Sequence, residues 1–233
     1  MYKSTSYVIG LLFVLIGTGC APVYLPSARH AHLLDKKGEL SVGGYAGING
    51  ADVQAAYAIS PDIGILAAGS FDKKNDPHST DYHKHRYGEL GLQYQYAYGI
   101  GRLELISGIG TGSATAVDNF SFSSSNIQAT GSYNKYFIQP NVGLETNIFE
   151  AGLALRMGRV VFTEFKTNSS RYTDNKSADF FEPALFAGLG GRHLKVEGQI
   201  GVSTPLQNDI GFDYEPFFFS LGLHLDFNLL ATK

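Results

Sequence analysis

The strongest constraint on the fold is a two-residue alternation near the C-terminal end of the chain. Large apolar side chains occupy every second position from Phe217 to Leu229, and Ser, Gly, His, Asp and Asn fill most positions between them. Strict alternation places the two sets on opposite faces of a β-strand. One long apolar face opposite a polar face is typical of a strand between lipid and the lumen of a barrel, although a soluble β-sandwich can also alternate.

The same pattern recurs in about ten segments, each close to the 9–11 residues that a tilted strand needs to cross a bilayer. Short turns connect some segments, and long polar stretches at 72–85, 113–131, 166–178 and 204–214 connect the others. Short and long connections at opposite ends are typical of bacterial outer-membrane barrels. We therefore predict an all-β fold over residues 38–233: a single antiparallel up-and-down transmembrane β-barrel of about ten strands, with eight as the alternative.

The N-terminus has the pattern of a secretory signal. Lys3 precedes the apolar run 8–16, and Gly17-Thr18-Gly19-Cys20 follows. This order predicts a signal peptide over residues 1–19, and the run is too short for a spanning helix. Cys20 is the only cysteine, and its surroundings resemble a bacterial lipobox, with Gly17 where Leu is usual. We predict lipidation of Cys20; the alternative is ordinary signal cleavage beside a free thiol.

The termini and the charge lead to expectations about location and partners. An even number of strands returns both chain ends to one side, so we expect an outer-membrane protein with both termini in the periplasm. Residues 20–37 are then a periplasmic linker that carries the lipid anchor. The net charge of −3 gives no reason to expect nucleic acid as a partner. The expected partners are outer-membrane lipid and, as a further candidate, another outer-membrane protein; no cofactor is expected.

Short motifs carry a resemblance to a known group of proteins. Residues 54–59 (QAAYAI) lead to 63–65 (IGI), and QPNVG at 139–143 and EPA at 182–184 follow. Together they resemble the uncharacterised outer-membrane β-barrel lipoproteins of Bacteroidota. The resemblance implies a barrel and its location, and it supplies no catalytic residues. Surface-exported lipoproteins of that phylum tend to carry acidic residues after the cysteine, so residues 21–24 (APVY) imply periplasmic retention.

The alternation also assigns polar residues to the lumen. Small barrels of about eight strands are filled by side chains, whereas 16–18 strands leave a channel. We therefore predict a packed polar interior. The protein would then be a structural or accessory component, for example one that docks on a larger outer-membrane complex. A narrow pore for small solutes is the alternative. The predicted network comprises Glu89, Glu104, Glu145, Arg156, Glu182, Lys195, Glu197, His224 and Asp226.

Two kinds of chemical site are alternatives to a purely structural role for these polar residues. His78, His83 and His85 are weak candidates for a metal site, because imidazole suits a transition metal, but a solvated loop fits that stretch better. Ser220 and His224 lie four residues apart on one strand face, or about 13 Å. No catalytic triad is recognisable, so we predict that the protein is not an enzyme. The third alternative for its function is an enzyme with its active site at the barrel rim.

Overall fold

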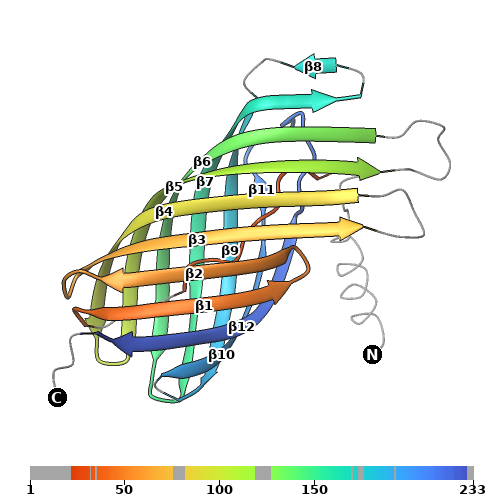
Figure 1. The fold of residues 1–233 in the computed structure, drawn as a ribbon. Helices are drawn as coiled ribbons and strands as arrows, with labels where there is room; N and C mark the ends of the chain where they lie inside the picture. The colour runs from red at the N-terminus through yellow and green to blue at the C-terminus, as the bar shows by residue number, and fades with distance from the viewer. Residues whose placement is uncertain are drawn as a thin grey trace, which may run out of the picture.

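The computed structural model describes residues 22–31, 33–34, 36–75, 82–118, 127–168, 170–172, 176–191 and 193–229. Ten long strands form one closed antiparallel barrel, which confirms the predicted fold class and strand number (Figure 1). No helix in these ranges is long and apolar enough to cross a membrane. The strands are β1 (Glu39–Gly47), β2 (Gly50–Ala58), β3 (Ile63–Asn75), β4 (Tyr82–Tyr98), β5 (Gly101–Asp118), β6 (Ile127–Glu145), β7 (Phe149–Thr167), β9 (Ser177–Gly190), β10 (Leu194–Val202) and β12 (Phe217–Asn228).

The sheet closes through the C-terminal strand. β12 pairs with β1 on one side and with β10 on the other, and β7 pairs with β9. Two short strands, β8 (Ser170–Tyr172) and β11 (Thr204–Pro205), add to β7 and β9 at the end of the barrel that carries the long connections. Closure leaves each long strand hydrogen-bonded on both sides, which removes the exposed edges that an open sheet would present.

The outward face of the barrel carries the apolar half of the alternation. Leu90, Leu144 and Leu223 expose 64%, 51% and 53% of their surface on the outer wall. Side chains of this kind continue around all ten strands. An apolar surface of this extent is far larger than a soluble monomer exposes, and a closed barrel satisfies its own backbone in lipid.

Four strands continue well past this apolar belt. β4, β5, β6 and β7 have 17, 18, 19 and 19 residues, against nine in β1. The interpretation of 113–118 and 127–131 as loop is therefore wrong. Above Ile109 the outward residues of β5 are Thr111 and Ser113, while the inward residues Ala114 and Ala116 are buried. The pattern inverts there because the outer wall faces water instead of lipid.

An aromatic cluster fills the lumen at this extended end. Tyr24 packs on Phe180 with ring centroids 4.7 Å apart, and Phe162 packs on Phe212 at the same distance. The register between β6 and β7 shifts at Ser132/Tyr133. Because of this shift, Phe162 and Phe165 both remain buried although they are three residues apart. The chain around 159–162 therefore stays in strand alternation, with apolar residues on its inner face.

The N-terminal segment runs through the barrel. Residues 22–31, 33 and 34 are buried along the lumen apart from Pro22, which is partly exposed. At the long-connection end, Tyr24 forms a parallel bridge with Tyr214. At the short-turn end, Leu34 lies beside Gly64 at the start of β3. The interpretation of these residues as a periplasmic linker is therefore wrong, because they pack inside the barrel as an inner segment.

The described chain ends lie at opposite ends of the barrel. His83, in the extended part of β4, contacts the carbonyl oxygen of Pro22 at 3.1 Å. Asn228 ends β12 at the short-turn end, opposite Glu39 of β1. An even number of strands alone would put both termini on one side, but the inner segment crosses the barrel once more.

The outward face can be tested by placing a charge in it. Leu223→Arg should destabilise the folded barrel in lipid vesicles by roughly 2–4 kcal/mol, because the guanidinium would face the middle of the bilayer. Ser113→Arg, outward on β5 but above the apolar belt, should change stability little. Urea unfolding in vesicles measures both, and equal losses would contradict the assignment of the belt.

Candidate functional site: the lumen and its inner segment

The inner segment lacks sheet partners over most of its length, so its backbone groups need other hydrogen bonds. Gln199 of β10 supplies two of them. Its Oε1 accepts from the Arg29 backbone N–H at 2.7 Å, and its Nε2 donates to the Arg29 carbonyl at 2.9 Å. Three further wall amides donate to carbonyls of the segment: Gln54 to Ala28 at 2.9 Å, Gln139 to His30 at 2.7 Å and Asn141 to His30 at 2.8 Å. The wall thus replaces a neighbouring strand.

A buried ion pair lies beside the middle of the segment. The two terminal nitrogens of the Arg156 guanidinium on β7 donate to the Glu89 carboxylate on β4, at 3.0 and 3.2 Å. Arg156 Nε also donates to Gln139 at 2.7 Å, and His30 Nε2 lies 2.8 Å from Glu89. Two parallel bonds of this kind fix both position and orientation. The pair therefore links the wall to the inner segment.

Glu182 on β9 collects a second set of contacts from wall and segment. The Tyr24 hydroxyl donates to it at 2.6 Å, Lys135 Nζ at 2.7 Å and the Ser203 hydroxyl at 3.0 Å. The guanidinium of Arg29 lies 3.5 Å away. Buried charge is costly unless it is paired and hydrogen-bonded. Lys135 and Ser203 of the wall supply part of these contacts to Glu182, and Tyr24 and Arg29 of the inner segment supply the rest.

A third group of charges lies near the short-turn end. Lys195 on β10 donates to Glu150 at 2.6 Å and to Glu145 at 2.9 Å. His224 on β12 lies 3.0 Å from Asp226 through Nε2. Its Nδ1 lies 3.4 Å from Glu150 and 3.5 Å from Glu197. This group faces a cavity of about 460 Å³ at the mouth of the barrel.

The structure divides the nine polar residues expected in the lumen among separate groups. Glu89 and Arg156 pair with each other, and Glu182 pairs with other residues. Glu104 accepts from Gln93 and Asn141 at 2.6 and 2.8 Å. The remaining five lie together near the mouth: Glu145, Lys195, Glu197, His224 and Asp226.

The sequence analysis missed several charged lumen residues, among them Arg29, His30, Lys135 and Glu150. Lys135 shares the inward parity of Phe137 and Gln139, so the alternation could have found it. Glu150 is the second residue of β7, directly after the short connection from β6. Arg29 and His30 belong to the inner segment, which has no period to indicate that it is buried.

The histidine candidates do not form a shared site. His83 contacts Asp72 at 2.8 Å, and His85 lies 2.8 Å from the Tyr133 hydroxyl. His78 and Cys20 lie outside the described residues. Within the described ranges, the one group of three side chains able to hold a metal ion is Glu150, Glu197 and His224.

A serine and a histidine do meet, but on neighbouring strands. Ser41 of β1 contacts His224 Nε2, while Glu150 lies beside Nδ1. This order resembles the Ser–His–acid relay of hydrolases. However, Ser41 is fully buried and its hydroxyl donates to Asp226 at 2.7 Å. A serine held in this way has no approach for a substrate, so we interpret the contact as part of the polar network.

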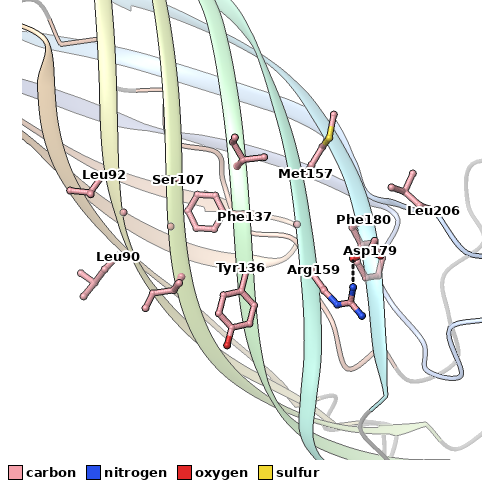
Figure 2. A pocket seen from close by; sticks show the side chains of 15 residues that line it. Leu90, Leu92, Ser107, Tyr136, Phe137, Met157, Arg159, Asp179, Phe180 and Leu206 are labelled. Carbon is pink, nitrogen blue, oxygen red and sulfur yellow. Dashed lines mark ion pairs between the residues drawn. The ribbon is translucent and has the colours of Figure 1, made fainter.

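The outer wall has a hollow of about 790 Å³ over β4 to β7 and β9. Figure 2 shows Leu90, Leu92, Tyr136 and Met157 along it. Ser107 leaves space between the larger outward side chains. Arg159 and Asp179 form an exposed ion pair of 3.9 Å at its edge. The lining is mostly apolar, so lipid chains can fill the hollow.

Comparisons with known proteins give only distant likenesses. No family model matches the chain, and no curated protein has a matching sequence. The chain is similar to the translocator domain of autotransporter NalP from Neisseria meningitidis, at 10% identity over 96% of this chain and 94% of that chain, with a TM-score of 0.46. It is also similar to the N-terminal β-barrel domain of Pseudomonas aeruginosa OprF, at 13% identity over 81% of this chain and 96% of that chain, with a TM-score of 0.32. LpxR from Salmonella typhimurium is similar at 10% identity over 80% of this chain and 99% of that chain, with a TM-score of 0.37. Likenesses at this level assign neither a family nor an activity.

Two arginines three residues apart on β7 provide a matched test of the lumen network. Arg156→Ala should destabilise the barrel by roughly 3–5 kcal/mol, because it leaves Glu89 buried without its partner. Arg159→Ala removes an exposed pair and should cost at most about 1 kcal/mol. Urea unfolding in detergent micelles compares the two. Similar losses in both variants would contradict the structural role of the Arg156–Glu89 pair.

Proposed function

We propose that this protein is a non-enzymatic outer-membrane barrel that is closed by its own N-terminal segment and serves as a structural or accessory component. The observation that carries the proposal is the inner segment, whose described residues from 23 to 34 lie buried in the lumen. The apolar belt supports a membrane location, and short turns opposite long extensions support the outer membrane. Contacts with partners then belong on the long connections or the outer wall.

The hydrogen bonds of the inner segment support a permanent closure. Its backbone is bonded by Gln54, Gln139, Asn141 and Gln199, and its side chains complete the partners of Glu182. Withdrawal would remove the bonds from these wall amides to the segment and the contacts of Tyr24 and Arg29 with Glu182, which would keep Lys135 and Ser203. Buried polar groups that lose a partner cost about 1–3 kcal/mol each. An open state of the lumen would therefore be rare without a force or ligand that compensates.

Lipidation of Cys20 is also part of the proposal, with a changed location for the lipid. Cys20 and Pro22 are two residue steps apart, which span at most about 7 Å. Pro22 lies at the long-connection end, beside His83. With short turns in the periplasm, a lipid on Cys20 would therefore be attached at the outer face. A lipid in the periplasmic leaflet is compatible only with an inner segment that has left the barrel.

The closed lumen predicts the electrical behaviour of the purified protein. In a planar bilayer the wild-type protein should show no stable, reproducible open channel. Replacement of residues 23–34 by a Gly-Ser sequence of equal length should produce a small conductance, because the side chains that fill the lumen are then missing. An open wild-type channel whose ion selectivity changes with Arg156→Ala or Glu145→Ala would show instead that the protein is a pore.

The position of the N-terminus can be tested on intact cells. Mass spectrometry of the mature N-terminus should find a lipid on Cys20. An epitope inserted between Ala21 and Pro22 should bind antibody on intact cells, because the inner segment delivers this point to the outer face.

The matched control is the same epitope after Lys233, which should react only in permeabilised cells. An unmodified Cys20 would end the lipid proposal. An N-terminal epitope that is also reached only after permeabilisation would contradict the threaded orientation.

A further inference from the structure

We propose that Glu150, Glu197 and His224 form a binding site for one divalent transition-metal ion inside the barrel. The three side chains come from β7, β10 and β12, and one potential ligand atom of each lies within 4.8 Å of the others. All three are buried. The site is independent of the proposed closure of the lumen.

The distances between the ligand atoms fit a metal ion better than a hydrogen bond. His224 Nδ1 lies 3.4 Å from Glu150 Oε1 and 3.5 Å from Glu197 Oε2. Hydrogen bonds from a ring N–H to oxygen are usually about 2.7–3.2 Å long. A tetrahedral ion with bonds of about 2.0–2.2 Å separates its ligand atoms by about 3.3–3.6 Å. The two distances from His224 Nδ1 to the carboxylate oxygens of Glu150 and Glu197 lie in this range.

Each ligand is held on its other side by a second residue. His224 Nε2 lies 3.0 Å from Asp226, which matches the carboxylate–histidine arrangement behind many metal sites. Glu150 Oε2 accepts from Lys195 at 2.6 Å, and Glu197 Oε1 accepts from Gln199 at 2.8 Å. These contacts orient the remaining atoms, Nδ1, Oε1 and Oε2, toward one another.

Glu197 has an oxygen with incomplete hydrogen bonding, although the Tyr45 hydroxyl interacts with the same carboxylate. Its side chain is fully buried, yet Oε2 accepts no hydrogen bond in standard geometry. A buried carboxylate oxygen without a donor is costly. Its nearest ion-pair contact is His224 Nδ1, at the distance given above. A metal ion between the two atoms would satisfy both.

The local charge also favours a divalent cation. In the ion-pair network that the described residues form around the site, four carboxylates belong to Glu145, Glu150, Glu197 and Asp226, and the fixed cations are Lys195 and Arg102. Four negative and two positive charges leave −2 when His224 is neutral. A divalent ion balances this charge. If Nδ1 of His224 carries a proton before the ion binds, the ion takes its place and the proton is released to solvent.

A cavity at the mouth of the barrel reaches the residues that contact the proposed ligands. The cavity of about 460 Å³ at the short-turn mouth is lined by Lys195 and Asp226, which contact the proposed ligands. Gly188 lies opposite Glu150 on β9, where a Cβ atom would lie 2.5 Å from Glu150 Oε1. The glycine therefore leaves room for the oxygen that would bind the ion. Imidazole with carboxylates suits Zn²⁺ and similar ions.

The test is a titration of the full-length folded protein, stripped of metal by a chelator, with Zn²⁺ followed by calorimetry. Wild-type protein should bind one ion per chain. Glu197→Gln should weaken binding by at least about tenfold, because one of three ligands is lost. Glu104→Gln is the matched control: it changes another buried lumen glutamate, bonded to Gln93 and Asn141, and should leave binding unchanged.

Co²⁺ provides a readout that needs no variant. Bound to wild-type protein, it should show the intense visible bands of a tetrahedral ion. A folded wild-type protein that binds no Zn²⁺ would overturn the proposal, and so would Glu197→Gln with unchanged affinity. If Glu197→Gln does not fold, as shown by its gel mobility before and after boiling, the Co²⁺ spectrum decides: weak octahedral bands would reject the site.

Discussion

The fold depends on the ion pairs and hydrogen bonds that charged side chains form inside a narrow lumen. Arg156, Lys135 and Lys195 are almost fully buried, and each contacts a carboxylate directly. A closed barrel in lipid must turn its polar side chains inward, and ten strands leave too little space to hydrate them. The side chains must therefore satisfy one another. The inner segment contributes to this balance, since Arg29 and His30 approach Glu182 and Glu89.

The barrel has two interiors because its outer surroundings change along its length. Within the apolar belt the outer face is apolar and the lumen is polar. Beyond the belt the long extensions of β4 to β7 face water, and aromatic side chains fill the lumen. The inner segment uses both interiors. Tyr24 packs in the aromatic cluster, while the backbone at Arg29 is bonded by wall amides.

In the proposed closed state, activity would lie away from an open channel. A cavity near the short-turn mouth faces a cluster of charged residues. A metal ion there would add a further cross-link between β7, β10 and β12. Such a cross-link would hold the region where the barrel closes through β12.

The sequence by itself determined the barrel, a strand number of about ten and the face on which the alternating wall residues lie. The reason is that alternation with a period of two is a local property, and lipid on one side enforces it along each strand. Parity therefore also placed Glu89, Arg156 and Glu182 in the lumen. It did not tell at what depth these residues lie or which of them meet.

Only the tertiary structure decided the path of the inner segment and the grouping of the charges. Residues 22–34 have no period, and their partners are remote in sequence: Gln199 is 170 residues from Arg29, and Gln139 is 109 residues from His30. Contacts across a lumen depend on barrel closure and strand stagger, which no local pattern records. For the same reason, Glu150, Glu197 and His224 come from three segments that no spacing in the sequence connects.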